Sequence, residues 1–198
     1  MKKYILVCLL SMVSLFAIAA GTKTVGTKKA ETKTALPSIV FDGKAYTLRY
    51  SAGNSQEWLN EYLPAGATFD NYTHMFAVRS YDGLKEATPA QIINSMARNY
   101  RRQNPGISFS VFQGNNGDAG MGFIMIQGNV LENNLFRVTK SNGKLISLQF
   151  VYREYTKSAN RTKEELAQAG AHIKTNLPRW KQSLLSMPVP NINHTVIQ

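Results

Sequence analysis

The sequence predicts an α+β domain, with a single twisted, mainly antiparallel sheet of about six or seven strands and two main helices packed on it. Three features predict this class. Short segments of alternating apolar residues are joined by short turns, which favours antiparallel pairing. Two longer segments carry apolar residues at helical spacing behind capping boxes. A folded part of about 150 residues is enough for one domain with its own core.

Alternation and turn residues place the strands. Seven segments are expected to be strands, at residues 39–41, 46–50, 73–81, 107–112, 121–127, 135–140 and 145–155. The first two are joined by a tight turn at Asp42-Gly43, and the last two by a turn at Ser141-Asn142-Gly143. In the last strand, Ile146 begins one alternating apolar face and Ser147 begins the opposite face.

A short helix is expected between the second and third strands. Residues 55–62 place Trp58, Leu59 and Tyr62 on one side at helical spacing. The segment Pro64-Ala65-Gly66 then ends this helix.

The two main helices both begin with a capping box. Thr88 and Gln91 form the first box, before the helix that leads towards Asn104. Thr162 and Glu165 form the second. The closing helix contains Pro178, which is expected to kink it or divide it in two.

The chain is expected to have four parts. These are a signal peptide at 1–20, a flexible basic linker at 21–37, a single α+β domain at 38–187 and a mobile tail at 188–198. Lys2 and Lys3 precede an apolar run that ends in small residues, which is typical of a secretory signal. The sequence therefore predicts a periplasmic or secreted protein with no membrane span in the mature chain.

Composition limits the chemistry of the mature chain. Cys8, within the expected signal peptide, is the only cysteine, so disulfides and thiol chemistry are excluded; such a chain is typical of a bacterial exported protein. Removing Lys2 and Lys3 leaves 21 basic and 12 acidic residues, a formal charge of +9. This charge favours anionic partners such as envelope components or acidic protein surfaces, whereas nucleic acid is not expected outside the cytoplasm.

The order of elements resembles the Mog1/PsbP-like family of small exported bacterial proteins. The resemblance lies in the opening hairpin at 39–50, the segment Glu61-Tyr62-Leu63-Pro64-Ala65-Gly66 leading to Asn71-Tyr72-Thr73 before a strand, and the closing helix. It implies an α/β sandwich used for binding or assembly. It implies no catalytic residue.

Candidate site residues fall into four groups. Aromatic residues flank the Pro64 loop and suit a recognition surface, at Trp58, Tyr62, Phe69 and Tyr72. His74 follows Asp70, which could orient an imidazole for base chemistry. A basic cluster ends the first main helix, at Arg98, Arg101 and Arg102, and a second lies between the last strand and the last helix, at Arg153, Lys157, Arg161 and Lys163. A glycine-rich hairpin loop could border a site with Asn115, Asn116 and Asp118.

These patterns favour binding over catalysis. No metal site, cofactor site or nucleophile motif is predicted. We expect an exported non-catalytic binding or assembly protein that acts on a protein or envelope partner, one version being an immunity-type protector. The alternatives are an envelope hydrolase that uses His74 and Asp70, and a polyanion-binding protein that uses the basic clusters.

Overall fold

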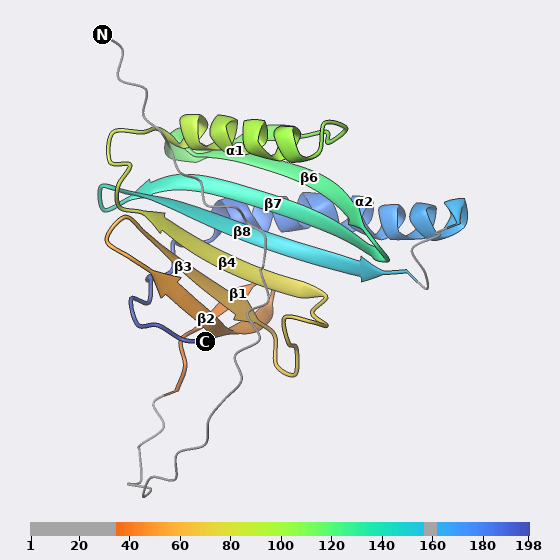
Figure 1. Ribbon diagram of the computed structural model, residues 1–198, viewed down its shortest axis with the longest axis horizontal. Helices are drawn as coiled ribbons and strands as arrows, with labels where there is room; N and C mark the ends of the chain where they lie inside the picture. Colours follow the sequence, from red (N-terminus) through yellow and green to blue (C-terminus); the bar gives the residue numbers. More distant parts are fainter. Residues whose placement is uncertain (1–34, 157–161) are drawn as a thin grey trace, which may run out of the picture. The chain divides into compact units, whose positions relative to one another are not determined.

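Within the described residues, eight strands form one open sheet and two α-helices pack on it (Figure 1). The computed structural model describes residues 35–156 and 162–198, so the expected signal peptide and most of the linker lie outside the described residues. The strands are β1 (Ser38–Phe41), β2 (Lys44–Gly53), β3 (Glu57–Leu63), β4 (His74–Tyr81), β5 (Ser110–Gln113), β6 (Ala119–Gln127), β7 (Val130–Ser141) and β8 (Lys144–Tyr155). The helices are α1 (Pro89–Gln103) and α2 (Lys163–Ser186).

Every pair of neighbouring strands is antiparallel. The strand order is β1-β2-β3-β4-β8-β7-β6-β5, so β4 and β8, far apart in the sequence, lie side by side in the middle. Both predicted hairpin turns are confirmed, since Asp42 and Asn142 adopt positive φ beside Gly43 and Gly143. The α+β class and the antiparallel sheet are therefore confirmed.

The short helix expected at residues 55–62 is wrong, and strand β3 takes its place. Trp58 and Tyr62, four residues apart, fit one face of a helix and also one face of a strand. In the structure they share a face with buried Asn60, while Leu59 and Glu61 face the other side. The sheet therefore has one strand more than the seven expected.

The two helices cover opposite faces of the sheet. Helix α2 packs on β7 and β8, where Trp180 and Ile173 join the larger core with Phe150, Phe76 and other residues of the central strands. Helix α1 packs on β6 and β7 through a second core that includes Ile93 and Phe136. Figure 1 shows α2 behind the sheet and α1 along the β6 side.

Both predicted capping boxes are confirmed. The Thr88 and Thr162 side chains accept from the backbone N–H of Gln91 and Glu165, and the reciprocal bonds are also present. Helix α2 is not divided at Pro178 but continues to Ser186.

The last residues of the chain pack against the sheet. We expected a mobile tail at 188–198, but Asn193 N–H donates to buried Asn60 at 2.6 Å, and Ile197 pairs with Ser51 in an antiparallel bridge. The backbone N–H groups of Ser51 and Ile197 donate to each other's carbonyls at 2.9 and 2.8 Å. This segment therefore belongs to the folded body.

Candidate functional site

On the face that carries α1, part of the sheet is not covered by any helix among the described residues, although the β3–β4 loop packs on one end of it through Phe69 and Tyr72. Helix α1 lies over β6 and β7, and none of the described helices crosses β3 and β4 on this side (Figure 1). The strand register places a set of polar side chains on this side, and we call them the polar face: Glu57, Glu61, Arg79, Glu132, Asn134, Gln149 and Arg153. On their opposite face, β4 and β8 are apolar, with residues such as Phe76 and Phe150 in the larger core.

A chain of hydrogen bonds runs along the polar face across β8 and β7. Gln149 Nε2 donates to Asn134 Oδ1 at 2.8 Å, and Asn134 Nδ2 donates to Glu132 Oε1 at 2.8 Å. Arg153 Nε donates to the other carboxylate oxygen of Glu132 at 2.6 Å. The Arg153 guanidinium also lies over the Tyr72 ring, 4.0 Å from its centroid. Each side chain is therefore held in one orientation by its neighbours.

The strands β3 and β4 add a second charged group. Arg79 pairs with Glu57 at 3.5 Å, although the Arg79 side chain is only 13% exposed. Glu61 lies opposite Ala77, which in turn lies opposite Gln149. Burial raises the pKa of the Glu61 carboxyl, and the positive charge of Arg79 opposes this rise.

The side chains of the polar face are held in fixed orientations. The face presents an amide, carboxylates and guanidinium groups that are partly withdrawn from water and already oriented. Groups fixed in this way lose little conformational freedom when a partner binds. Among the described residues no cluster of three or more metal-ligating side chains occurs, here or elsewhere.

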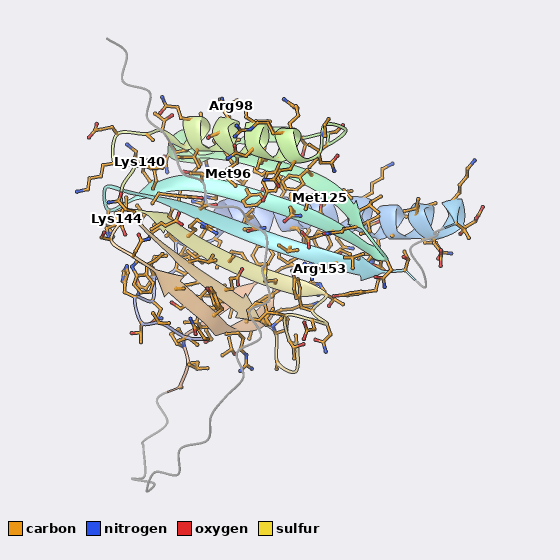
Figure 2. The ribbon with its side chains drawn as sticks, in the orientation of Figure 1. Met96, Arg98, Met125, Lys140, Lys144 and Arg153 are labelled. Carbon is orange, nitrogen blue, oxygen red and sulfur yellow. The ribbon has the colours of Figure 1, made fainter. Side chains whose placement is uncertain are left out.

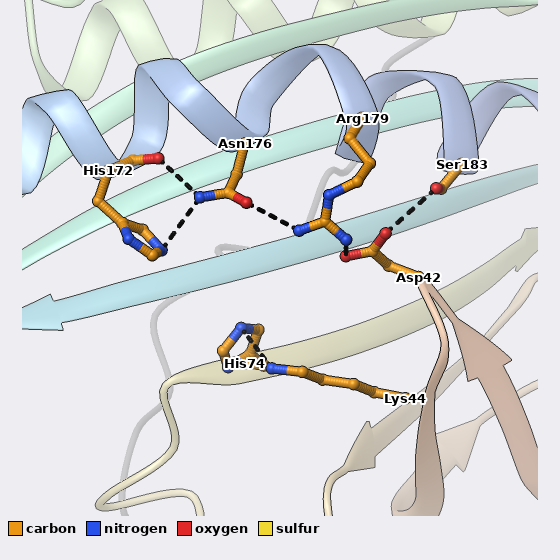
Figure 3. Close-up of polar contacts among 7 residues, drawn as sticks. All are labelled: Asp42, Lys44, His74, His172, Asn176, Arg179 and Ser183. Atoms are coloured by element: carbon orange, nitrogen blue, oxygen red, sulfur yellow. Dashed lines mark hydrogen bonds and ion pairs between the residues drawn. The ribbon is translucent and has the colours of Figure 1, made fainter.

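His74 belongs to a different group, on the α2 side of the sheet (Figure 3). Its Nε2 lies 3.3 Å from Lys44 Nζ and its Nδ1 lies 2.9 Å from Thr73 Oγ1. The Tyr152 ring stands between the two histidines, 5.2 Å from His74 and 5.0 Å from His172. Along α2, His172, Asn176, Arg179 and Ser183 form a polar stripe, and Arg179 pairs with Asp42 of the β1–β2 turn.

Electrostatics keep His74 neutral. Burial first, and then the charges of Lys44 and His172, lower the pKa of the imidazole to about 4. A neutral ring can accept at Nε2 from the Lys44 ammonium. Asp70, the predicted orienting carboxylate, makes no contact with His74; its residue lies exposed in the loop before β4.

The predicted aromatic surface is divided between the two faces of the sheet. Tyr62 is buried in the larger core, and Trp58, on the same face, lies 5.2 Å from the His194 ring. Phe69 and Tyr72 instead join a small cluster with Leu63 on the side of the polar face. Of the four aromatic residues, Tyr72 is the one that contacts the polar face, through Arg153.

The predicted basic cluster of the first main helix lies at the exposed side of α1. Arg98, Arg101 and Arg102 are all exposed, and Arg101 lies 5.2 Å from the centre of the Phe109 ring. Figure 2 shows Arg98 on this helix, and Lys140 and Lys144 at the β7–β8 turn, away from Arg153. Of the second predicted cluster, Lys157 and Arg161 lie outside the described residues. Positive charge is therefore spread over the surface.

The glycine-rich loop forms the β5–β6 hairpin, as expected. Asn115 and Asn116 are exposed, and Asn116 has a φ of 58°. Asp118 is buried and pairs with Arg137 at 2.7 Å, so it supports the fold. This loop and the Pro64 loop lie at opposite strand ends, and the two strands β8 and β7 separate their hairpins, so they do not border one site.

No described helix is long and apolar enough to cross a membrane. Fold and surface together define a small α+β protein with a preorganised polar sheet face. The chain belongs to a protein family of unknown function, whose model matches residues 34–187.

Similarity to other proteins is distant. The crystal structure of PA94, a protein of unknown function from Pseudomonas aeruginosa, aligns with 80% of this chain and all of its own, at 12% sequence identity and a TM-score of 0.38. This likeness carries no argument about function. No curated protein matches the sequence. The comparisons give no support to the Mog1/PsbP-like resemblance.

The polar face was largely missed in the sequence. Its residues come from four strands, and only the register brings them together. One signal was available, because Ser147, Gln149 and Arg153 alternate with apolar residues in a strand that proves to be central. Polar alternation in a central strand indicates a face that no apolar layer covers.

Proposed function

We propose that this is an exported, non-catalytic binding or assembly protein, and that a protein partner of the cell envelope docks on the polar face. The observation that carries the proposal is the bonded chain from Gln149 through buried Asn134 and Glu132 to Arg153, which runs beside the part of the sheet that no described helix covers. Export rests on the predicted signal peptide. An immunity-type protector is one biological form of this function.

The charges of the polar face favour a protein surface over a simple polyanion. Glu57, Glu61 and Glu132 lie beside Arg79 and Arg153, so the face offers both signs. A uniformly negative polymer would meet these carboxylates, whereas a protein surface can complement both. Mixed charges also specify the orientation of the partner.

A matched pair of charge reversals tests the proposal. Glu57→Arg changes the polar face at its more exposed end, and Glu86→Arg makes the same change at an exposed position before α1. Immobilised wild-type and variant proteins are incubated with envelope extract, and the bound proteins are quantified by mass spectrometry.

We expect an envelope protein that binds the wild type and Glu86→Arg equally, and Glu57→Arg at least about tenfold more weakly, which corresponds to about 1.4 kcal/mol. Equal binding of the envelope protein by all three proteins, or the absence of any bound partner, would exclude the polar face as the docking surface. Circular dichroism of Glu57→Arg separates loss of the surface from loss of the fold.

A polyanion-binding function is a second candidate, since Arg98, Arg101 and Arg102 are exposed together on α1. Binding of this kind weakens as salt rises, because exposed charges are screened. Retention on heparin that does not change between low and high salt would exclude the polyanion-binding function. Nothing in the geometry favours the hydrolase alternative, since His74 contacts Lys44 and Thr73 and not Asp70.

A further inference from the structure

The two edges of the sheet differ in how far other residues cover them. At the first edge, β1 pairs with the beginning of β2, and the N–H of Leu48 donates to the carbonyl of Pro37 at 2.8 Å. Farther along β2, the bridge between Ser51 and Ile197 continues the cover. Residues from both ends of the domain therefore cover β2, and the outermost strand, β1, is only four residues long, which limits pairing at this edge.

At the second edge, β5 covers only part of the outer side of β6. Strand β6 runs from Ala119 to Gln127, but β5 pairs only with Ala119–Gly122. None of the described residues pairs with the outer side of β6 from Ile124 to Gln127. Its outward backbone N–H and C=O groups are free for another strand.

The side chains of this open edge are apolar and exposed. Ile124 is 42% exposed and Ile126 is 48% exposed, and both lie on the face that carries α2. The whole of β6 contains no charged residue and no proline, and its pairing with β7 is regular, without a bulge. Charges, prolines and bulges are the usual means of protecting an edge, so none of them blocks pairing here.

We propose that the open edge of β6 pairs with the same edge of a second copy of this chain, antiparallel and about a two-fold axis. With Met125 opposite Met125 of the second copy, Ile124 faces Ile126 of the other chain on both sides of the axis. The four isoleucines then cover one another on one face of a continuous sheet.

Two observations favour a second copy over a foreign strand. The pattern Ile-Met-Ile is the same read in either direction, so the edge is complementary to itself. Although the mature chain carries a formal charge of +9, β6 carries none, so pairing brings no like charges face to face. The length of the open edge also suits this pairing. In the proposed register the paired strand of the second copy ends at its Gly128, next to Gly122, where β5 begins to pair with β6.

Cysteine cross-linking tests the pairing directly. Cys8→Ser removes the natural thiol, and a single cysteine is introduced at Met125, the position that lies opposite itself in the proposed register. Val40→Cys on β1 and Val111→Cys on β5 are the controls; their side chains are 66% and 65% exposed. We expect a disulfide-linked dimer from Met125→Cys and from neither control.

Sedimentation provides the second measurement. Ile126→Lys places a charge on the open edge, and Val40→Lys makes the matched change at the protected edge. We expect Ile126→Lys to weaken dimerisation at least about tenfold and Val40→Lys to leave it unchanged.

A wild-type chain that stays monomeric at about 1 mM, or cross-linking at Val111 instead of Met125, would overturn the proposal. Because Glu57 lies on β3, and β4, β8 and β7 separate β3 from β6, loss of pairing leaves the Glu57→Arg experiment unaffected.

Discussion

Replacing Arg137 by Met should lower the free energy of unfolding much more than a typical surface substitution does. Arg137 Nε donates to Asp118 at 2.7 Å, and its Nη1 donates to the carbonyls of Leu184 and Met187 at 3.1 and 2.6 Å. The Arg137 and Asp118 side chains are only 12% and 6% exposed. One guanidinium therefore joins the β5–β6 loop, β7 and the end of α2.

The magnitude follows from what the substitution leaves behind. Breaking a buried ion pair by removing one partner costs about 3–5 kcal/mol, because the remaining charge stays buried. The helix carbonyls also lose their donor, which adds to this loss if water does not reach them. We therefore expect Arg137→Met to lower the free energy of unfolding by about 4 kcal/mol and the melting temperature by about 10 °C.

Urea unfolding followed by circular dichroism measures this change. Asp118→Ala and the double variant complete a thermodynamic cycle, in which the double variant should be less destabilised than the two single losses added together. A loss below about 1 kcal/mol in Arg137→Met, or strictly additive effects, would refute this account of the loop and the helix end.

Three further predictions concern α2 and its surroundings. Trp180→Ala should lower the free energy of unfolding by about 3–5 kcal/mol, because the indole is 2% exposed and packs on Phe150 and Tyr152. Urea unfolding measures this change, and a loss under about 1 kcal/mol would contradict the packing. Thr162→Ala should lower the free energy of unfolding by about 1 kcal/mol because it removes the N-cap of α2, whereas Thr162→Ser should retain most of the stability that the cap contributes. Because the His74 pKa is about 4 in the folded state against 6.5 ordinarily, the unfolded chain binds more protons between these values, so stability should fall as pH falls from about 6.5 to 4. His74→Gln should flatten that part of a stability-against-pH curve, and an unchanged slope would contradict the assignment.

Local signals predicted most of the fold. The turns at Asp42-Gly43 and Asn142-Gly143 and the boxes at Thr88 and Thr162 depend on a few adjacent residues, so they can be read without knowing the tertiary structure. The length of β7 could not be read in this way. We expected this strand from residue 135, yet it begins at Val130.

The polar residues that concealed the start of β7 are those that build the polar face. Glu132 and Asn134 look like loop residues in the sequence, because strands disfavour them. In the structure, Gln149 and Arg153 of the adjacent strand satisfy their side chains. Such pairing depends on which strands become neighbours, which local sequence does not specify.

The positions of the expected site residues could not be predicted from local sequence for a similar reason. Trp58 and Tyr62 were grouped with Phe69 and Tyr72 because they are close in the sequence. In the structure Trp58 and Tyr62 lie on the α2 side of β3, whereas Phe69 and Tyr72 lie in the β3–β4 loop, which packs on the other face. Asp118 was a plausible ligand residue in a loop, and its burial against Arg137 became visible only in the fold.

Photo-crosslinking in cells that produce the protein tests the central claim most directly. A photoreactive residue is placed at Gln149, in the middle of the polar face, or at exposed Gln182 on α2. Docking on the polar face predicts one discrete adduct from position 149 and none from position 182. An adduct from position 182 alone, or none from either position, would contradict it.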